Sequence, residues 1–154
     1  MIRAGYLKAV FVVVCSLLIN ACTVANYVVP AYTTLKFEVS HDVNPDLNGR
    51  ASPVVVKVFE ISSKTIFETQ DFFSLYDEPE GYLGPDLIIS SEFELAPNSK
   101  YEHELTLAPG VRYAGILVAY RDIENARWRE LIEIDKSDYR TVNVNVGGLA
   151  VFAN

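Results

Sequence analysis

Short segments in which apolar and polar side chains alternate are the main pattern of this sequence. Between residues 33 and 40, Leu35, Phe37 and Val39 alternate with charged or small polar side chains. Residues 101–107 and 142–146 repeat this period of two. Because successive side chains of a strand point to opposite faces of a sheet, the alternation predicts strands with one buried face.

Other segments are apolar on both faces or alternate less regularly. Val54–Ile61 is β-branched and apolar at both phases and is predicted as an interior strand, and residues 111–121 form the most apolar run after residue 22. Leu87–Leu95, Arg127–Ile134 and Leu149–Ala153 are further strands, bounded by turn-forming residues. Seven or eight short strands predict an all-β fold, a two-sheet antiparallel β-sandwich.

One stretch, at about residues 62–80, is predicted as a short helical insertion. Ser62 or Ser63 can cap a first helical turn, and Thr69 can cap a second. Breakers that can end the stretch follow, namely Gly81, Gly84 and Pro85.

Large apolar side chains crowd the second helical turn. We predict that they pack against the sheet; the alternative is an exposed apolar patch for a second partner. The side chains in question are Phe72, Phe73, Leu75 and Tyr76. Trp128 is predicted to be buried in the sandwich for the same reason.

The N-terminus has the pattern of a targeting segment. Arg3 and Lys8 precede an apolar run of 11 residues at 9–19, which is too short to span a membrane and suits a secretory signal. The run ends in Ile19-Asn20-Ala21-Cys22, which resembles the bacterial lipobox, with lipid attached to Cys22. The alternative is an ordinary signal peptide with an incidental cysteine.

This assignment divides the chain into three parts. Residues 1–21 are a lipoprotein signal peptide that is removed, residues 22–32 are the lipidated Cys and a tether, and residues 33–154 are the β-sandwich domain. Several acyl chains on Cys22 give stable membrane anchoring, which a single chain does not. Thr23 rather than Asp follows the cysteine, and in enteric-type bacteria this implies sorting to the outer membrane.

Removal of the signal peptide changes the length and the net charge of the chain. The full chain has 154 residues, 13 basic and 20 acidic, with a net charge of −7. Removing 21 residues, Arg3 and Lys8 among them, leaves 133 residues with 11 basic and 20 acidic side chains, a charge of −9. An acidic chain without a basic face argues against nucleic acid as a partner. Cys15 leaves with the signal and Cys22 carries lipid, so no disulfide forms.

Candidate chemistry is sparse. His41 and His103 are the two histidines, and neither belongs to a nucleophile–base pattern or to a metal motif. Asn44, Asp46 and Asn48 with the following glycine imitate the start of a calcium loop, but Val55 stands where its bidentate Glu belongs. We therefore predict a protein that is not an enzyme and has no metal or cofactor.

The order of several motifs resembles the TssJ family of type VI secretion lipoproteins. The motifs are Val43-Asn44-Pro45-Asp46, Gly49-Arg50-Ala51-Ser52-Pro53-Val54-Val55-Val56, Asp71-Phe72-Phe73-Ser74-Leu75-Tyr76, Leu83-Gly84-Pro85-Asp86-Leu87 and Tyr120-Arg121-Asp122 with Trp128-Arg129. The resemblance implies a transthyretin-like sandwich with a small helical insertion. It also implies a lipid-anchored protein on the periplasmic face of the outer membrane.

The resemblance further implies a docking role. Members of the family bind the periplasmic C-terminal region of TssM and nucleate the TssJ–TssL–TssM membrane complex. The loop between the first two strands is implicated in that contact, which maps here onto Asn44, Pro45, Asp46, Leu47, Asn48, Gly49, Arg50, Ala51 and Ser52. Arg50 is the favoured contact residue, and the alternative is a solvated charge or an internal pair with Asp42 or Asp46.

Two other classes of function stay open at this point. A periplasmic lipoprotein of this fold could bind a small ligand or glycan between its sheets; a pocket there favours that function and a filled core opposes it. An enzyme is the weaker rival, because the sequence has no catalytic constellation.

Overall fold

The computed structural model describes residues 32–135 and 139–154. The predicted signal peptide, Cys22 and the tether as far as residue 31 therefore lie outside the described residues. Among the described residues, no helix has the length and apolar character needed to cross a membrane.

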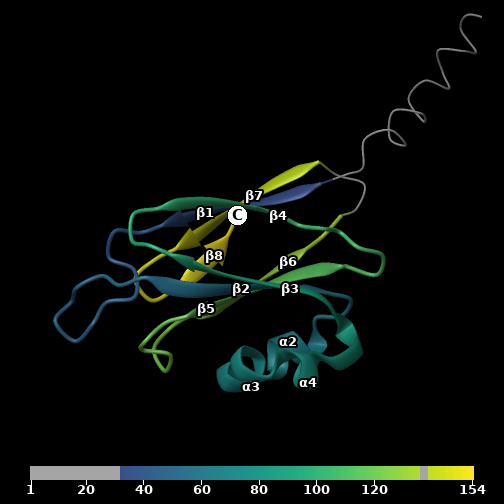
Figure 1. The fold of residues 1–154 in the computed structure, drawn as a ribbon, viewed down its shortest axis with the longest axis horizontal. Helices are drawn as coiled ribbons and strands as arrows, with labels where there is room; N and C mark the ends of the chain where they lie inside the picture. The colour runs from purple at the N-terminus through teal and green to yellow at the C-terminus, as the bar shows by residue number, and fades with distance from the viewer. Residues whose placement is uncertain (1–31, 136–138) are drawn as a thin grey trace, which may run out of the picture. The chain divides into compact units, whose positions relative to one another are not determined.

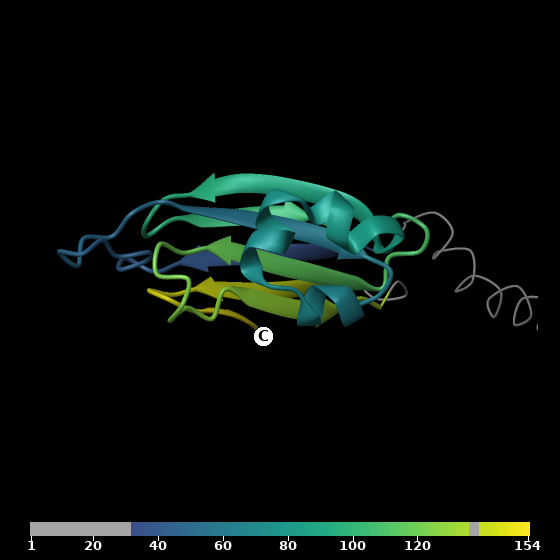
Figure 2. The same ribbon diagram turned by 90° about the horizontal axis from the view of Figure 1, so that it is seen from below.

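Within the described residues, eight strands form two four-stranded sheets that pack face to face (Figures 1 and 2). In the first sheet the strand order is β4-β1-β7-β8, with β1 Thr33–Val39, β4 Lys100–Glu104, β7 Arg140–Val146 and β8 Val151–Ala153. In the second the order is β3-β2-β5-β6, with β2 Val54–Ile61, β3 Leu87–Leu95, β5 Tyr113–Ala119 and β6 Arg129–Glu133. The predicted two-sheet sandwich is confirmed.

The strand pairs are antiparallel except for one. β1 and β7 run parallel, in a register that joins Thr33 to Arg140 and Val39 to Val146. The predicted antiparallel sandwich therefore contains one parallel pair, which the sequence did not indicate. Alternation fixes which face of a strand is buried but carries no information on the direction of its neighbour.

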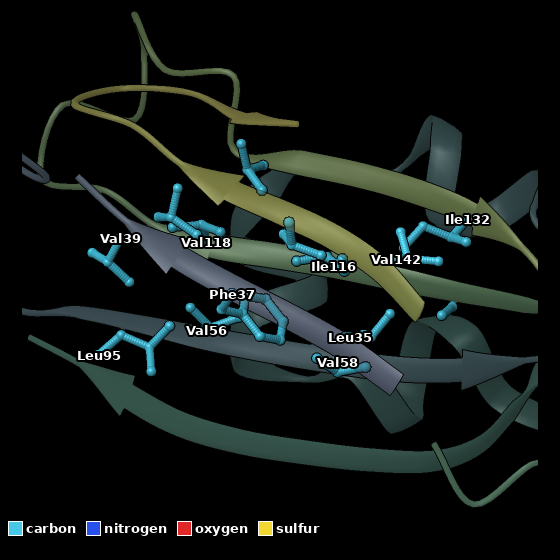
Figure 3. Packing of buried hydrophobic residues seen from close by; sticks show 14 of the residues in the cluster. Leu35, Phe37, Val39, Val56, Val58, Leu95, Ile116, Val118, Ile132 and Val142 are labelled. Carbon is cyan, nitrogen blue, oxygen red and sulfur yellow. The ribbon is translucent and has the colours of Figure 1, made fainter. Parts of the chain in front are cut away.

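The main core lies between the two sheets. Leu35 and Phe37 of β1 meet Val56 and Val58 of β2, and all four are at most 1% exposed (Figure 3). Their alternate positions on each strand bring every second side chain into this layer. The apolar side chains that alternate along β1 thus form one buried face, as predicted.

A second apolar cluster covers the other face of the β3-β2-β5-β6 sheet, where three short helices pack (Figure 2). Phe59 and Ile61 of β2 and Leu117 of β5 are fully buried there. Consequently β2 and β5 each have an apolar layer on both faces, which explains why their apolar residues occur at both phases. The prediction of β2 as an interior strand is correct.

The helical layer is longer than predicted. It consists of α2 Thr65–Thr69, α3 Phe72–Asp77 and α4 Pro79–Leu83, followed by a 3₁₀ turn, η1 Gly84–Asp86. Gly81, expected to end the helical stretch, lies inside α4, because Pro79 at the first helical position starts a new turn. The break falls instead at Gly84, whose φ is +50°.

The packing of the insertion differs from the prediction at one aromatic residue. Phe72 and Leu75, three positions apart on one face of α3, are buried, and Tyr76 is partly buried. Phe73 is 61% exposed, so its predicted burial is wrong. Adjacent residues of a helix point about 100° apart, and one short helix cannot bury both phenylalanines against a sheet. Trp128 is half-buried and packs against both apolar clusters.

A buried carboxylate links the helix-covered sheet to the loop after β4. Glu60 is 2% exposed and accepts the backbone N–H groups of Thr106 and Leu107 at 2.8 and 2.9 Å. Leu107 has a positive φ of +51°, which turns the chain out of the strand predicted for residues 101–107. β4 itself ends earlier, at Glu104.

Candidate functional site

The connection between β1 and β2 is the predicted recognition loop, and it projects from one end of the sandwich. It leaves β1 in one sheet and enters β2 in the other (Figure 1). It follows the C-terminal end of β1, whereas Tyr32, the first described residue, directly precedes the N-terminal end of that strand. The ribbon views show the loop extending beyond the sheets (Figures 1 and 2). Residues 44–52 are referred to below as the docking loop.

The base of the docking loop is fixed by Asn44. Its side chain is 4% exposed, and its amide donates to the carbonyl oxygen of Pro53 at 2.8 Å. Its carbonyl oxygen accepts the backbone N–H of Arg121, also at 2.8 Å. Asn44 has a φ of +50°, a conformation that Asn tolerates better than most residues. It joins both ends of the loop to the loop after β5.

This burial changes the role expected of Asn44. The sequence placed it among the exposed partner contacts, and the structure shows a side chain whose polar groups are occupied internally. Asn44 is therefore a positioning residue for the loop, and its side chain is not a contact surface.

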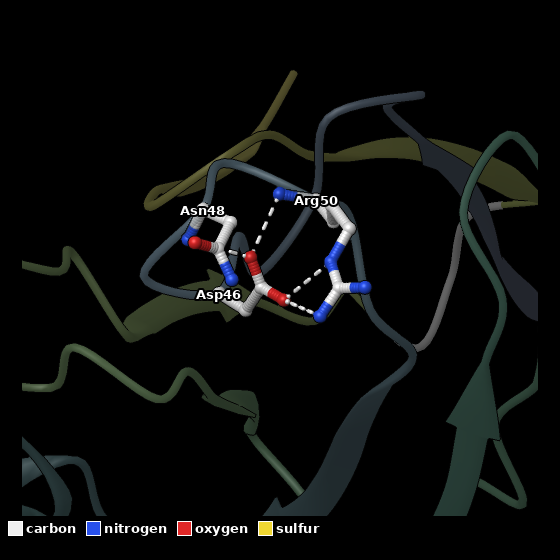
Figure 4. A network of polar contacts seen from close by, with 3 residues as sticks. All are labelled: Asp46, Asn48 and Arg50. Atoms are coloured by element: carbon white, nitrogen blue, oxygen red, sulfur yellow. Dashed lines mark hydrogen bonds and ion pairs between the residues drawn. The ribbon is translucent and has the colours of Figure 1, made fainter.

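Asp46 organises the rest of the loop (Figure 4). One carboxylate oxygen accepts the backbone N–H groups of Asn48 and Arg50, at 2.8 and 2.9 Å. The other accepts Nε of Arg50 at 2.8 Å, and Nη2 of Arg50 lies at the same distance. Gly49, with a φ of +75°, makes the turn between Asn48 and Arg50. Hydrogen bonds to an ionised carboxylate are stronger than those between neutral groups, so these contacts hold the loop and the Arg50 side chain in place.

The same contacts explain the electrostatics of the loop. The backbone N–H of Arg50, followed by its guanidinium, lowers the pKa of the Asp46 carboxyl. The internal pair predicted as one alternative for Arg50 is thus observed, with Asp46 and not Asp42 as its partner. The Arg50 side chain nevertheless remains 77% exposed, so the pairing holds it in place without covering it.

Leu47 is the most exposed apolar side chain of the loop. Its relative exposure of 107% means that nothing in the fold covers it. Beside it is an open hollow of about 780 Å³, lined by Pro45, Asp46, Leu47, Asn48, Arg121, Asp122 and Leu149. Sequence reasoning missed the last three as part of this surface, although Arg121 and Asp122 belong to one of the motifs.

The calcium-like pattern of the loop has another use. Both carboxylate oxygens of Asp46 accept donors of the loop itself, and the Asn44 oxygen accepts Arg121. Within residues 32–135 and 139–154, no group of three or more His, Cys, Asp or Glu side chains could hold a metal ion. The Asn, Asp and Gly residues therefore act as turn formers here.

Neither histidine lines the hollow beside the docking loop. His41 is exposed at the end of β1. His103 on β4 is half-buried against Phe93, with ring centroids 5.5 Å apart. Burial lowers the pKa of His103, and the nearby charge of Glu60 opposes the change. This is the environment of a packing residue at a sheet edge.

The described part of the chain is thus a two-sheet sandwich with a helical layer on one sheet and a loop held in shape by its own contacts. The sequence model of T6SS-SciN, the family described as type VI secretion lipoprotein, VasD, EvfM, TssJ, matches residues 31–149. The chain belongs to this TssJ family of type VI secretion lipoproteins. The family resemblance derived from the motifs is confirmed.

Solved structures with the same fold are consistent with that membership. The T6SS lipoprotein TssJ1 from Pseudomonas aeruginosa is 28% identical, with a TM-score of 0.78 over 82% of this chain and 96% of that chain. Serratia marcescens Lip, a membrane-bound component of the type VI secretion system, is 23% identical, with a TM-score of 0.71 over 82% and 97%.

A third similar chain lies in a solved structure described as the T6SS protein TssM C-terminal domain (869-1107) from EAEC. It is 17% identical, with a TM-score of 0.70 over 80% of this chain and 97% of that chain. At this identity the likeness concerns the fold alone. No curated protein sequence matches the chain.

Proposed function

We propose that this lipoprotein is anchored in the outer membrane, faces the periplasm, and binds the periplasmic C-terminal region of TssM through its docking loop. In this role it helps to assemble the TssJ–TssL–TssM membrane complex and performs no catalysis. One observation carries the proposal: a loop held in shape by Asp46 presents a fully exposed leucine, Leu47, beside an open hollow.

The physical argument concerns the cost of binding. A loop that is ordered before binding loses little conformational entropy when a partner arrives. A fully exposed leucine gains the most from being covered, about 1.5–3 kcal/mol for a completely buried side chain. The Arg50 guanidinium, held by Asp46 and still exposed, supplies the charged contact that often accompanies such an anchor.

The direction of the loop fits attachment by the N-terminus. Tyr32 directly precedes β1, and the docking loop follows the other end of that strand. Residues 23–32, if extended, would reach at most about 33–36 Å from a lipidated Cys22. The tether would thus hold the domain near the membrane, with the docking loop directed away from Tyr32.

Binding of a small ligand or glycan between the sheets is the alternative. It requires a space between the sheets, but the side chains that meet there are almost completely buried in one cluster (Figure 3). The hollow of about 780 Å³ lies instead at the loops. No feature of the described core therefore favours this alternative over docking.

The loop can be tested by binding measurements with the full-length lipoprotein and the periplasmic region of TssM. Leu47→Asp should weaken binding by at least about tenfold, because a charged group replaces the apolar anchor. Deleting residues 48–52 should abolish binding without unfolding the domain. Phe152→Ala, which removes a 47% exposed aromatic on β8, is the matched control and should bind normally. Undiminished affinity of the Leu47→Asp protein would place the interface elsewhere.

The anchor can be tested separately by membrane fractionation. Cys22→Ser should lose acylation and leave the outer membrane, because no sulfur remains to carry the lipid. A protein that still fractionates with the outer membrane would refute the lipid anchor while leaving the docking proposal intact.

A further inference from the structure

The outer face of the helical insertion presents two aromatic side chains to solvent. Phe73 of α3 is 61% exposed and Tyr82 of α4 is 44% exposed. A hollow of about 210 Å³ lies beside them, lined by Asp71, Phe73, Ser74, Asp77, Glu78 and Tyr82. This hollow, called the insert groove below, shares no residue with the docking loop.

The insert groove is built on rigidly held helices. Phe72 and Leu75, on the inner face of α3, belong to the buried cluster on the sheet. Lys57 of β2 donates to the carbonyl oxygen of Tyr76 at 2.7 Å and lies 4.5 Å from the centre of its ring. The Phe73 ring stands edge-on to Phe72 with centroids 5.2 Å apart. The groove therefore needs no rearrangement before a partner binds.

Its charge selects the kind of partner. Three carboxylates line the groove, and no basic side chain does. The carboxylate of Asp71 accepts the N–H and the hydroxyl of Ser74 at 3.1 and 2.6 Å, and so is fixed in position. In the described part of the chain, Asp77 and Glu78 form no ion pair at all. Anionic groups beside exposed ring faces favour a cation and repel phosphate or acidic peptides.

The protein already uses this chemistry internally. The Lys57 ammonium lies over the Tyr76 ring while pairing with Glu92 at 3.1 Å. The Arg129 guanidinium lies 4.5 Å from the centre of the Trp128 ring and donates to main-chain carbonyls of the insertion. In both cases the cation combines an aromatic face with oxygen acceptors.

We propose that the insert groove binds an arginine-bearing, basic segment of a partner protein, at a site separate from the docking loop. The guanidinium stacks on Phe73 or Tyr82 and donates to the carboxylates of Asp77 and Glu78. Arginine is favoured over lysine because its planar fork can stack and pair at the same time. A second copy of this chain is disfavoured, since removal of residues 1–21 leaves 11 basic against 20 acidic side chains. An anionic lipid surface is repelled for the same reason.

The proposal can be tested by ¹H–¹⁵N NMR titration of the full-length protein in neutral detergent micelles. The probe is a five-residue acetylated and amidated peptide with two arginines, and the control peptide replaces both with uncharged citrulline. The arginine peptide should cause saturable shifts of the amides of α3 and α4. The citrulline peptide should bind at least about threefold more weakly, since it cannot pair with the carboxylates.

Matched variants separate a built site from general attraction to an acidic protein. Phe73→Ala should weaken arginine-peptide binding about two- to fivefold, and Asp77→Asn with Glu78→Gln should weaken it as well. Phe152→Ala, which removes an exposed aromatic next to Arg127, should leave binding unchanged. A urea denaturation curve for each variant checks that the fold is intact.

Three outcomes would overturn the proposal. The first is that both peptides cause equal amide shifts. The second is that the shifts are spread over the surface and persist in the Phe73→Ala variant. The third is that the amides of α3 and α4 shift in the same way when the protein concentration is raised without peptide. The last would identify a second copy as the occupant. Deletion of residues 48–52 should not alter the titration, so a failure of the docking-loop proposal and a failure here are distinguishable.

Discussion

Replacing Asn44 tests whether the docking loop is held by its base. The Asn44 side chain is buried and makes two hydrogen bonds of 2.8 Å, to the carbonyl of Pro53 and from the N–H of Arg121. Asn44→Ala removes both bonds and puts alanine at a φ of +50°. Asn44→Gly removes the same bonds but accepts this backbone conformation without cost.

The two variants therefore separate hydrogen bonding from backbone strain. Each lost hydrogen bond costs about 1 kcal/mol net. The left-handed conformation costs alanine roughly 1 kcal/mol more. We expect the free energy of unfolding to fall by about 3 kcal/mol for Asn44→Ala and by about 2 kcal/mol for Asn44→Gly.

Urea denaturation followed by the fluorescence of Trp128, the one tryptophan of the chain, measures these differences. Far-ultraviolet circular dichroism supplies the second probe that a two-state analysis needs. The N–H of Arg121 should also lose hydrogen-exchange protection in both variants. If the free energy of unfolding of Asn44→Ala lies within about 0.5 kcal/mol of the wild-type value, the base of the loop is not held by these two hydrogen bonds.

Three further predictions concern charge and packing. The pKa of the Asp46 carboxyl is lowered in the folded protein. Its contribution to loop order is therefore present above the ordinary pKa of an aspartate and is lost as the pH falls through the lowered pKa, so the NMR shift of the Arg50 amide should stay constant from neutral pH down to about 4. Asp46→Asn should alter the Arg50 amide shift at every pH. Gly115→Ala would place its methyl group 2.8 Å from the Phe67 ring and should destabilise the fold by about 1–3 kcal/mol, measured in urea. Glu60→Ala leaves the N–H groups of Thr106 and Leu107 without their charged acceptor and should cost about 3 kcal/mol by the same assay, whereas a loss near zero would show that water replaces the carboxylate.

The strands were the most predictable part of the fold. The alternating Leu35, Phe37 and Val39 face the core, and β2 is interior because it is apolar at both phases. Strand ends were less predictable. Leu105 and Leu107 keep the alternating pattern, but β4 ends at Glu104, and Glu60 accepts the N–H groups of Thr106 and Leu107 in the loop that follows.

The docking loop was found from its motif, but the roles of its residues were not. Composition cannot tell that Asn44 is buried while Leu47 is fully exposed, since a hydrophobic scale predicts the reverse. Arg50 was left with two alternatives, and the structure shows that it pairs with Asp46 and remains exposed. Arg121, Asp122 and Leu149 join the surface only through folding, because they come from distant loops.

The sequence by itself determined which faces of the strands are buried, the family, and the candidate anchor at Cys22. These depend on local periodicity and on motifs of adjacent residues, which need no knowledge of distant contacts. Only the tertiary structure decided that β1 and β7 run parallel and that Phe73 faces solvent. The direction of β7 relative to β1 depends on how distant segments pair. The exposure of Phe73 depends on which face of α3 packs against the sheet. Neither can be predicted from one segment alone.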